Sequence, residues 1–229
     1  MKKIFFILSL TLSAPSQAMY FSSYIYEMNS KEDFISKYIT NDTETRNLYN
    51  IHAYAIEKPS NTNEVKLNIS DKEILYAPLR KVIDAQVTDI FKIFYRGPKD
   101  SKERYYRVVF TETPLTTFGK NEQQRSSTYL PSISLSTILI VRPKNQKFEY
   151  KIDEKLGIIK NTGNTFFRAI IHNDCHTRDE DADHVYILPS EEYQNDLIKQ
   201  PNKNNIFLII DKKYIPIVNR CEIEKNNLE

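Results

Sequence analysis

The chain has 229 residues, a formal net charge of +2 at pH 7, two cysteines, four glycines and no tryptophan. This nearly balanced charge gives no reason to expect nucleic acid or an anionic membrane surface as a partner. The 15 tyrosines and 12 phenylalanines can fill protein cores without a cofactor.

The first 18 residues have the three parts of a secretory signal peptide. Lys2 and Lys3 form the charged start, residues 4–12 the apolar middle, and residues 16–18 the cleavage site with its small side chains. The apolar run is much shorter than the roughly 20 residues that cross a bilayer. We therefore expect cleavage after residue 18, a mature chain that begins near Met19, no stable membrane insertion and a location outside the cytoplasm.

Short runs of aromatic and β-branched residues follow, separated by turn residues, and this pattern is typical of strands. No window of 12 or more residues carries an apolar stripe at helical spacing. In the first part of the chain we expect strands at 34–40, 48–56, 65–69, 73–79, 81–84, 88–95, 105–111 and 133–141. In the second part we expect strands at 148–152, 156–160, 166–172, 185–188, 206–210 and 214–218.

Two groups of about seven strands predict an all-β fold with two immunoglobulin-like β-sandwich domains. Between the groups lies the polar segment 142–145, which contains Pro143. It predicts a linker, because Pro cannot continue a central strand. We therefore expect an N-terminal domain over residues 19–143 and a C-terminal domain over residues 144–229.

Two segments of the first domain carry more information than the rest. Residues 94–114 hold two strand-like runs around Gly97 and Pro98, which predicts a long hairpin or a crossover between strands. Residues 116–127 lack apolar periodicity and predict a long loop, and long loops in compact domains are often functional or disordered. Beyond that loop, Ile133 and Leu135 alternate with serines, so one face of the next strand is apolar.

Several motifs occur in one order along the chain: Phe-Tyr-Arg-Gly-Pro at 94–98, Lys-Glu-Arg-Tyr-Tyr-Arg-Val-Val at 102–109, Thr-Ile-Leu-Ile-Val at 137–141, Asn-Thr-Gly-Asn at 161–164, Tyr-Ile-Leu-Pro at 186–189 and Lys-Tyr-Ile-Pro-Ile-Val at 213–218. In order and spacing they resemble the periplasmic chaperones of the common pilus (Ecp or Mat type). They are more distantly similar to the PapD-like chaperones of the chaperone–usher pathway. The resemblance implies two immunoglobulin-like domains in a boomerang or L arrangement, without catalysis.

The resemblance also implies partners and a mode of binding. Such a chaperone binds one pilin subunit, supplies the strand that the subunit's incomplete sandwich lacks, and delivers the subunit to an outer-membrane usher. Strand addition of this kind gains affinity from main-chain hydrogen bonds and specificity from alternate side chains. The implied strand is residues 129–141, with Tyr129, Pro131, Ile133 and Leu135 as candidate pocket-filling side chains. Judged from the residues alone, Ile133 and Leu135 are equally compatible with facing the domain's own core.

The family's usual carboxylate anchors are replaced in this chain. Such chaperones hold the subunit's terminal carboxylate with an Arg of the first strand and a Lys of the last strand. Here residues 22–26 contain no cation, and the last-strand position falls at Thr137 or Ile138. Arg107 and Arg125 are the candidate substitutes, because a guanidinium binds a carboxylate through two hydrogen bonds. The alternative for each is a solvated surface charge.

Two further pairs are candidates for structural roles. Glu103 and Arg142 fit the family's charge pair across the domain junction, where an ion pair would fix the angle between the domains. Cys175 and Cys221 can form a disulfide in an oxidising compartment, although the sequence alone does not set the distance between their Cα atoms.

Three alternatives compete with the chaperone hypothesis. Residues 172–184 hold three His, Cys175 and several Asp, and these residue types suggest a periplasmic metal-binding protein. Their spacing, however, lacks the tight repeats of zinc sites. Catalytic signatures such as Gly-x-Ser-x-Gly, His-Glu-x-x-His and a phosphate-binding glycine loop are absent from the sequence. A pilus subunit or adhesin shares the immunoglobulin-like fold, but should have an incomplete sandwich. We expect no metal, cofactor or enzymatic activity.

Overall fold

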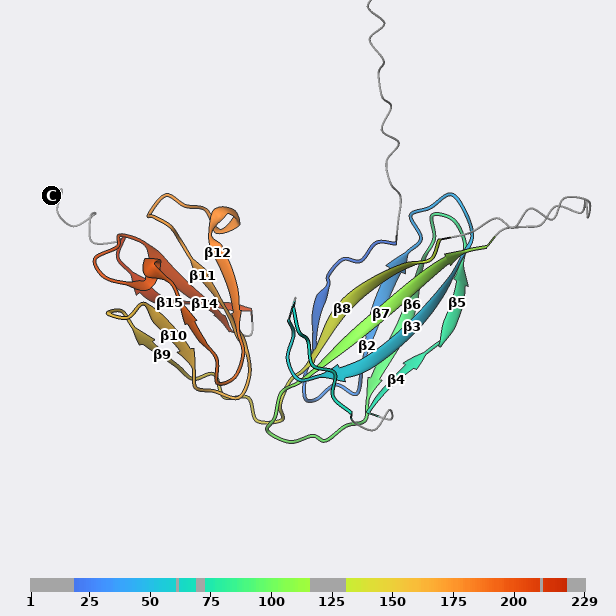
Figure 1. Cartoon of the computed structure of the whole chain (residues 1–229), viewed down its shortest axis with the longest axis horizontal. Helices are drawn as coiled ribbons and strands as arrows, with labels where there is room; N and C mark the ends of the chain where they lie inside the picture. The colour runs from blue at the N-terminus through green and yellow to red at the C-terminus, as the bar shows by residue number, and fades with distance from the viewer. Residues whose placement is uncertain (1–18, 61, 69–72, 116–130, 211, 222–229) are drawn as a thin grey trace, which may run out of the picture.

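The computed structural model describes residues 19–60, 62–68, 73–115, 131–210 and 212–221. These residues form fifteen strands and two short 3-10 helices, arranged as two β bodies side by side with the chain crossing between them once, after residue 141 (Figure 1). None of the helices in this part of the chain is long and apolar enough to span a membrane.

The first body is a sandwich of two sheets. The larger sheet has the strand order β1-β8-β7-β3-β5, and the smaller one has the order β2-β6-β4. β1 runs parallel to β8, whereas the remaining neighbours are antiparallel. The strands are β1 Ile25–Met28, β2 Phe34–Thr40, β3 Asn47–Ile56, β4 Ile74–Ala77, β5 Arg80–Ile83, β6 Thr88–Tyr95, β7 Arg104–Pro114 and β8 Ile133–Val141.

The second body is also a sandwich. One sheet has the order β12-β11-β14-β15 and the other has the order β13-β10-β9. The elements are β9 Tyr150–Asp153, β10 Ile158–Asn161, β11 Phe167–Ile171, η1 Asp179–Asp181, β12 Asp183–Ile187, β13 Glu192–Gln194, η2 Asp196–Ile198, β14 Asn205–Ile210 and β15 Lys213–Asn219.

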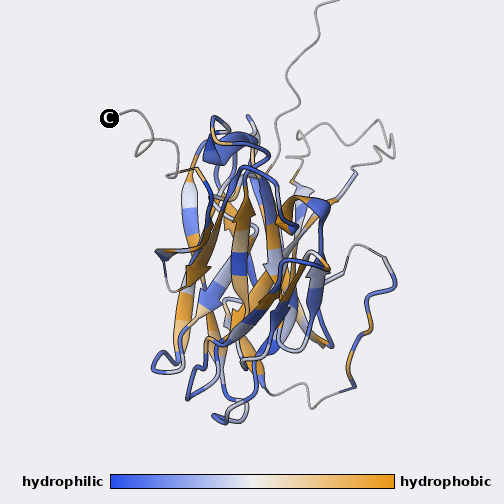
Figure 2. Cartoon of the chain, turned by 90° about the vertical axis from the view of Figure 1, so that its left-hand side faces the viewer, coloured by the Kyte–Doolittle hydropathy of each residue, from blue (hydrophilic) through white to orange (hydrophobic). Residues whose placement is uncertain are grey.

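Each sandwich buries its own apolar core between its two sheets. In the first, Tyr49 and Phe110 of the larger sheet meet Ile39 and Phe91 of the smaller one. Apolar residues are concentrated in the strands, where polar bands interrupt them, whereas the loops are largely polar (Figure 2). Strand side chains alternate between the two faces of a sheet, so one side of each strand supplies the core.

A third apolar cluster joins the two sandwiches. Ile56, Tyr105 and Ile140 come from the first, and Phe166 and Leu188 come from the second. All five side chains are buried, so the junction has a small hydrophobic core of its own.

The structure differs from the expected elements in a few places. Residues 65–69 were expected to be a strand, but within the described residues 62–68 only Lys66 pairs, in an isolated bridge with Ile56. β1 and β13 were not expected, because each is very short and is stabilised by neighbours far away in the chain. β6 and β7 belong to different sheets, so residues 94–114 form a crossover and not a hairpin.

Candidate functional site

The first half of β8 is paired on one side only within the described part of the chain. β7 pairs with β8 along its whole length, from Ile133 opposite Glu112 to Val141 opposite Arg104. β1 pairs only with the second half, beginning at Ile138. Residues 133–137 therefore present a free strand edge, on the side of the first sandwich that faces the second one (Figure 1). Such an edge offers main-chain donors and acceptors to an added strand.

The side chains along this edge differ in exposure. Ile133 is 42% exposed and Pro131 is also exposed. Leu135 is half-buried and packs against the core of the first sandwich. Among the expected pocket-filling residues, Ile133 is therefore accessible, Leu135 is partly used by the chain's own core, and Tyr129 lies outside the described residues.

Two hydroxyl groups meet between β1 and β8. The Tyr26 hydroxyl lies 3.0 Å from Thr137 Oγ1, which also donates a hydrogen bond to the carbonyl of Val108 at 3.1 Å. Burial raises the pKa of Tyr26, so this contact is one between neutral groups at physiological pH. It connects β1 to β8 at residue 137, where the free edge ends.

A lysine that the sequence analysis did not single out lies beneath β1. Lys37 is 6% exposed, its Nζ donates to the carbonyl of Ser23, and this ammonium lies 4.3 Å from the centre of the Tyr26 ring. Burial lowers the pKa of Lys37. Its position in β2 gave no signal in the sequence, because a single Lys in a strand is ordinarily an exposed charge.

Arg107 already has a carboxylate partner. Its guanidinium contacts both oxygens of Glu64, with Nε 3.2 Å from Oε1 and Nη2 against Oε2, and both side chains are largely buried. Arg107 also lines a pocket of about 260 Å³ between the sandwiches, together with Ile138 and Tyr186. Arg125, the other candidate anchor, lies outside the described residues.

A further pocket lies at the junction, and three cations and Glu27 are among the residues that line it. Its volume is about 470 Å³, and its lining includes Tyr26, Arg142, Arg168 and Lys212. Arg142 is paired with acidic side chains, as described below, whereas Arg168 and Lys212 pair with none in the described part of the chain. This cleft can therefore accept negative charge from a bound partner.

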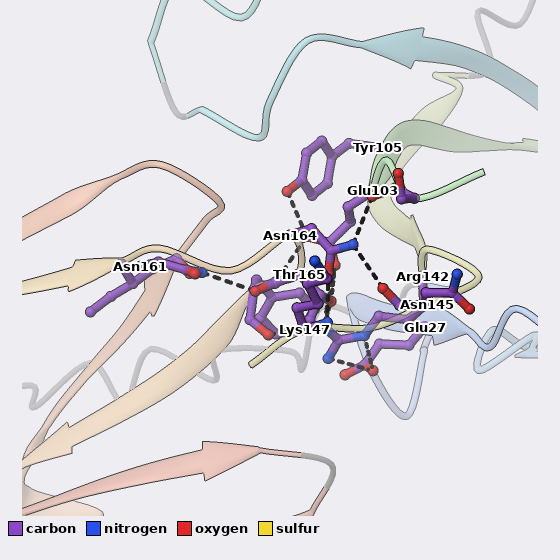
Figure 3. A network of polar contacts seen from close by, with 12 residues as sticks. Glu27, Glu103, Tyr105, Arg142, Asn145, Lys147, Asn161, Asn164 and Thr165 are labelled. Atoms are coloured by element: carbon purple, nitrogen blue, oxygen red, sulfur yellow. Dashed lines mark hydrogen bonds and ion pairs between the residues drawn. The ribbon is translucent and has the colours of Figure 1, made fainter. Parts of the chain in front are cut away.

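Arg142 and Glu103 lie together at the centre of the junction (Figure 3). Arg142 Nη1 is 3.2 Å from Glu103 Oε2 and 2.9 Å from the carbonyl of Phe166, which it reaches across the junction. Arg142 Nε donates to Glu27 at 2.9 Å, and Arg142 Nη1 also donates to the Thr165 hydroxyl. The guanidinium carbon lies 3.8 Å from the centre of the Phe166 ring. One side chain thus connects β1, the start of β7 and the second sandwich.

Glu103 also accepts several hydrogen bonds at the junction. It accepts hydrogen bonds from the Tyr105 hydroxyl at 2.6 Å, from the backbone N–H of Phe166 at 3.1 and 3.2 Å, and from the Thr165 hydroxyl. Burial raises the pKa of Glu103, and the bonds from Thr165, Tyr105 and Arg142 oppose that rise. The sequence suggested this pair but not Glu27, Thr165 or Phe166, which are distant from it in the chain.

Further contacts join the two sandwiches at the junction. Asn164 Nδ2 donates to the carbonyls of Ser101 and Asn145, both at 2.8 Å, and so joins the second sandwich to the first (Figure 3). Gly163 allows this turn to approach the chain closely, because a Cβ there would lie 2.0 Å from the carbonyl oxygen of Lys147. Lys58 Nζ forms a more exposed link to Glu191 at 2.7 Å.

The His-rich and Asp-rich segment is occupied by other interactions. Cys175 is joined to Cys221 in a disulfide with a Cα–Cα distance of 5.5 Å. His172 Nε2 lies 2.9 Å from Asp179 Oδ1, and His184 Nε2 lies 2.6 Å from the Asp179 carbonyl. Among the described residues, no group of three or more His, Cys, Asp or Glu side chains is arranged to hold a metal ion.

No protein-family model matches the chain. The chain is 33% identical over 216 residues to the probable fimbrial chaperone EcpE of Escherichia coli strain K12, a match that covers 92% of this chain and 89% of EcpE. It is 30% identical over 225 residues to the probable fimbrial chaperone EcpB of Klebsiella pneumoniae strain 342, covering 95% of this chain and all of EcpB.

Solved structures share the fold at low sequence identity. The periplasmic chaperone SfaE has a TM-score of 0.54 at 10% identity, covering 87% of this chain and 98% of SfaE. The class 5 fimbriae chaperone CfaA has a TM-score of 0.53 at 15% identity, covering 88% and 99%. SafB, solved in complex with the Salmonella enterica SafA pilin, has a TM-score of 0.53 at 14% identity, covering 89% and 92%. The expected all-β fold of two sandwich domains is confirmed.

Proposed function

This chain belongs to the fimbrial chaperone family that includes EcpE and EcpB, and from that premise we propose how it works. It acts in the periplasm after removal of residues 1–18, binds a pilin subunit by adding the free edge of β8 to the subunit's incomplete sandwich, and delivers that subunit to an outer-membrane usher. Membership in a chaperone family confirms the expectation that the chain is not an enzyme, and it favours a chaperone over the pilus-subunit and metal-binding alternatives.

The observation that carries the proposal is the one-sided pairing of residues 133–137. An incoming strand can form main-chain hydrogen bonds along this edge, each contributing about 1 kcal/mol net. Burial of the part of Ile133 that is still exposed, 42% of the residue, in a subunit pocket contributes roughly 1 kcal/mol more. SafB was solved with a pilin, which supports a subunit as the partner.

The donated side chains differ in what binding requires of them. Ile133 is accessible as it stands, so it serves as the principal pocket-filling residue of the described edge. Pro131, two positions earlier in the chain, is also exposed. Leu135 contributes only with the part of its side chain that the core leaves uncovered. Tyr129, outside the described residues, comes two positions before Pro131 in the sequence and stays a candidate.

The subunit's carboxylate is proposed to enter the cleft between the sandwiches. Arg107 lies there, but its guanidinium would have to exchange Glu64 for the incoming carboxylate. Arg125 remains a candidate. The Glu103–Arg142 pair holds the two domains, whose boundary we place between Pro143 and Lys144, at the angle that shapes this cleft.

Co-expression with pilin subunits encoded beside the chaperone gene, followed by co-purification, tests the proposal. Ile133→Asp should reduce recovery of the complex at least tenfold, because it replaces an apolar contact with a charge that the subunit pocket must bury. Val82→Asp is the matched control, since Val82 is 46% exposed on β5 at the opposite edge of the same sheet. Equal recovery for Ile133→Asp and the unmodified chain would rule out the β8 edge as the donated strand.

A further inference from the structure

Glu112 is a buried carboxylate in β7 that the chaperone function does not use. It is 3% exposed. Its Oε1 accepts a hydrogen bond from Asn47 Nδ2 at 2.6 Å, and its Oε2 accepts one from the Met19 nitrogen at 3.1 Å. Within the described part of the chain, no Lys, Arg or His pairs with it. A buried carboxylate without a cation is costly, so its retention in this core needs a reason.

The residues that follow the expected cleavage site enter the core at once. Met19 and Phe21 are 3% and 2% exposed, whereas Tyr20 between them is 60% exposed. Tyr20 forms a bridge with Thr40, and the Phe21 ring lies 4.9 Å from the ring of Phe110. The alternation of a buried strand therefore begins at Met19 itself.

We propose that in the mature chain Glu112 binds the α-ammonium group of Met19 in a buried ion pair. This inference rests on the cleavage after residue 18 that is part of the proposed function. Hydrolysis of the Ala18–Met19 peptide bond by a signal peptidase adds one water, leaves a carboxylate on Ala18 and frees the amine of Met19. That amine takes up a proton below its ordinary pKa of about 8. Processing thus converts an amide hydrogen bond into a charge pair at the same nitrogen.

The surroundings of Glu112 suit a cation at this position. Burial raises the pKa of the Glu112 carboxyl, and the neighbouring polar groups of Tyr49, Met19 and Asn47 oppose that rise only in part. A positive charge 3.1 Å away would favour the ionised carboxylate. Tyr49 is the titratable group that faces Glu112 from β3; burial and the Glu112 charge raise its pKa, so it stays neutral while the amine titrates.

The pair lies beside the free edge of β8. In the register of the larger sheet, Glu112 is directly opposite Ile133 on one side and opposite Tyr49 on the other. A mature N-terminus held by Glu112 would therefore stabilise the sheet where the subunit-binding edge starts. The precursor, which has no charge at this nitrogen, would be less stable than the mature chain.

A double-mutant cycle tests this inference. Four full-length mature proteins are made: the chain that begins at Met19, the chain with Gly-Ser added before Met19, and the Glu112→Gln variant of each. Unfolding in urea is measured at pH 7 and pH 9.5, and the N-terminus of each protein is checked by intact mass. At pH 7 the Gly-Ser extension should lower the folding equilibrium constant about tenfold more in the Glu112 chain than in the Glu112→Gln chain.

The pH dependence separates an ion pair from packing. Pairing with Glu112 raises the pKa of the amine in the folded state, so the added stability is complete below about pH 8, the unfolded value, and is lost as the pH rises through the folded value. The tenfold coupling should therefore shrink at pH 9.5. An extension effect that is equal in both backgrounds, or unchanged between the two pH values, would overturn the ion pair.

The same proteins distinguish failure of this inference from failure of the proposed function. A natural N-terminus other than Met19, found on the protein secreted with its own leader, overturns the inference because the amine would then lie elsewhere. Co-purification with a subunit, measured on the same chains, tests the chaperone function independently. Binding that persists while the coupling is absent would remove only the Glu112 pair.

Discussion

Arg142 Nη1 lies 3.2 Å from Glu103 Oε2, and both side chains are almost fully buried between the two sandwiches. The two residues are 39 positions apart, and each also contacts the second sandwich through Thr165 and Phe166. Because the pair joins three segments of the chain, it couples the packing of one domain to that of the other.

Removal of the Arg142 charge should be strongly destabilising. Arg142→Met leaves Glu103 buried without its cation, which costs about 3 to 5 kcal/mol for a buried pair. Urea unfolding followed by circular dichroism measures the loss. Arg46→Met is the control, because Arg46 and Asp84 form a pair that is more than 60% exposed at both side chains, and such pairs contribute about 0 to 1 kcal/mol. Equal losses in the two variants would contradict the buried pair.

Leu135 and Ile133 should separate stability from binding. Leu135→Ala removes a side chain that packs on the core, and we expect a loss of about 1 to 2 kcal/mol because the residue is only half-buried. Ile133→Ala should lower the free energy of unfolding by less than about 1 kcal/mol, since Ile133 is 42% exposed. Thermal unfolding of both variants provides the comparison. A larger loss for Ile133→Ala would mean that Ile133 belongs to the core.

Gly163→Ala should disrupt the junction turn. The added Cβ would lie 2.0 Å from the Lys147 carbonyl oxygen, and that atom belongs to backbone and cannot rotate away. We expect a loss of more than about 2 kcal/mol, as for other strained or overpacked sites. Gly97→Ala is a milder comparison, because its Cβ would meet the end of the Tyr95 side chain and not backbone. Urea unfolding should rank the two variants in that order; the reverse order would contradict the prediction.

The disulfide should stabilise the second sandwich. Cys175 and Cys221 are 46 residues apart, so the bond restricts a long loop in the unfolded chain. The Cys175→Ser, Cys221→Ser double variant should lose about 2 to 4 kcal/mol. Urea unfolding with and without reductant measures this: reductant should lower the stability of the unmodified chain and leave that of the double variant unchanged. Insensitivity of the unmodified chain to reductant would contradict a structural role.

Glu154 should make a contribution to the stability of the fold that is lost in acid. Its Oε2 accepts a hydrogen bond from Arg220 at 2.8 Å, which lowers the pKa of the Glu154 carboxyl. A lowered pKa in the folded state means that the stability is present above the unfolded value of about 4.3 and is lost as the pH falls through the folded value. Glu154→Gln should therefore cost no more than about 1 kcal/mol at pH 7. Urea unfolding measured from pH 7 to pH 2 should show that this loss of stability disappears below about pH 3. A loss that stays constant over this range would contradict the predicted role of Glu154.

The sequence predicted the strands well because their signal is local. Alternating apolar residues in β2, β3, β7 and β8 mark a strand and its buried face without reference to any partner. β1 was missed because its place in the sheet depends on pairing with β8, which joins residues more than 100 positions apart. For the same reason the sequence left residues 94–114 open between a hairpin and a crossover.

The candidate site was predictable only in part. Glu103 and Arg142 were named as a pair by resemblance. Only the tertiary structure identified Glu27, Thr165 and Phe166 as their further partners. Arg107 was named as a candidate carboxylate anchor by its chemistry, and the structure places it against the carboxylate of Glu64, 43 positions away. The roles of Arg107, Arg125 and the donated side chains in subunit binding stay predictions.

The sequence by itself determined the all-β class, the two groups of strands, the family resemblance and the order of the motifs. These depend on which residues follow one another, and a strand's period of two is visible within a few positions. Only the tertiary structure decided that the β8 edge is half covered by β1, that Leu135 faces inward, and that Glu112 meets the nitrogen of Met19. Each of these depends on the packing of segments that are distant in the chain, and the hydrophobic burial that drives such packing is non-directional.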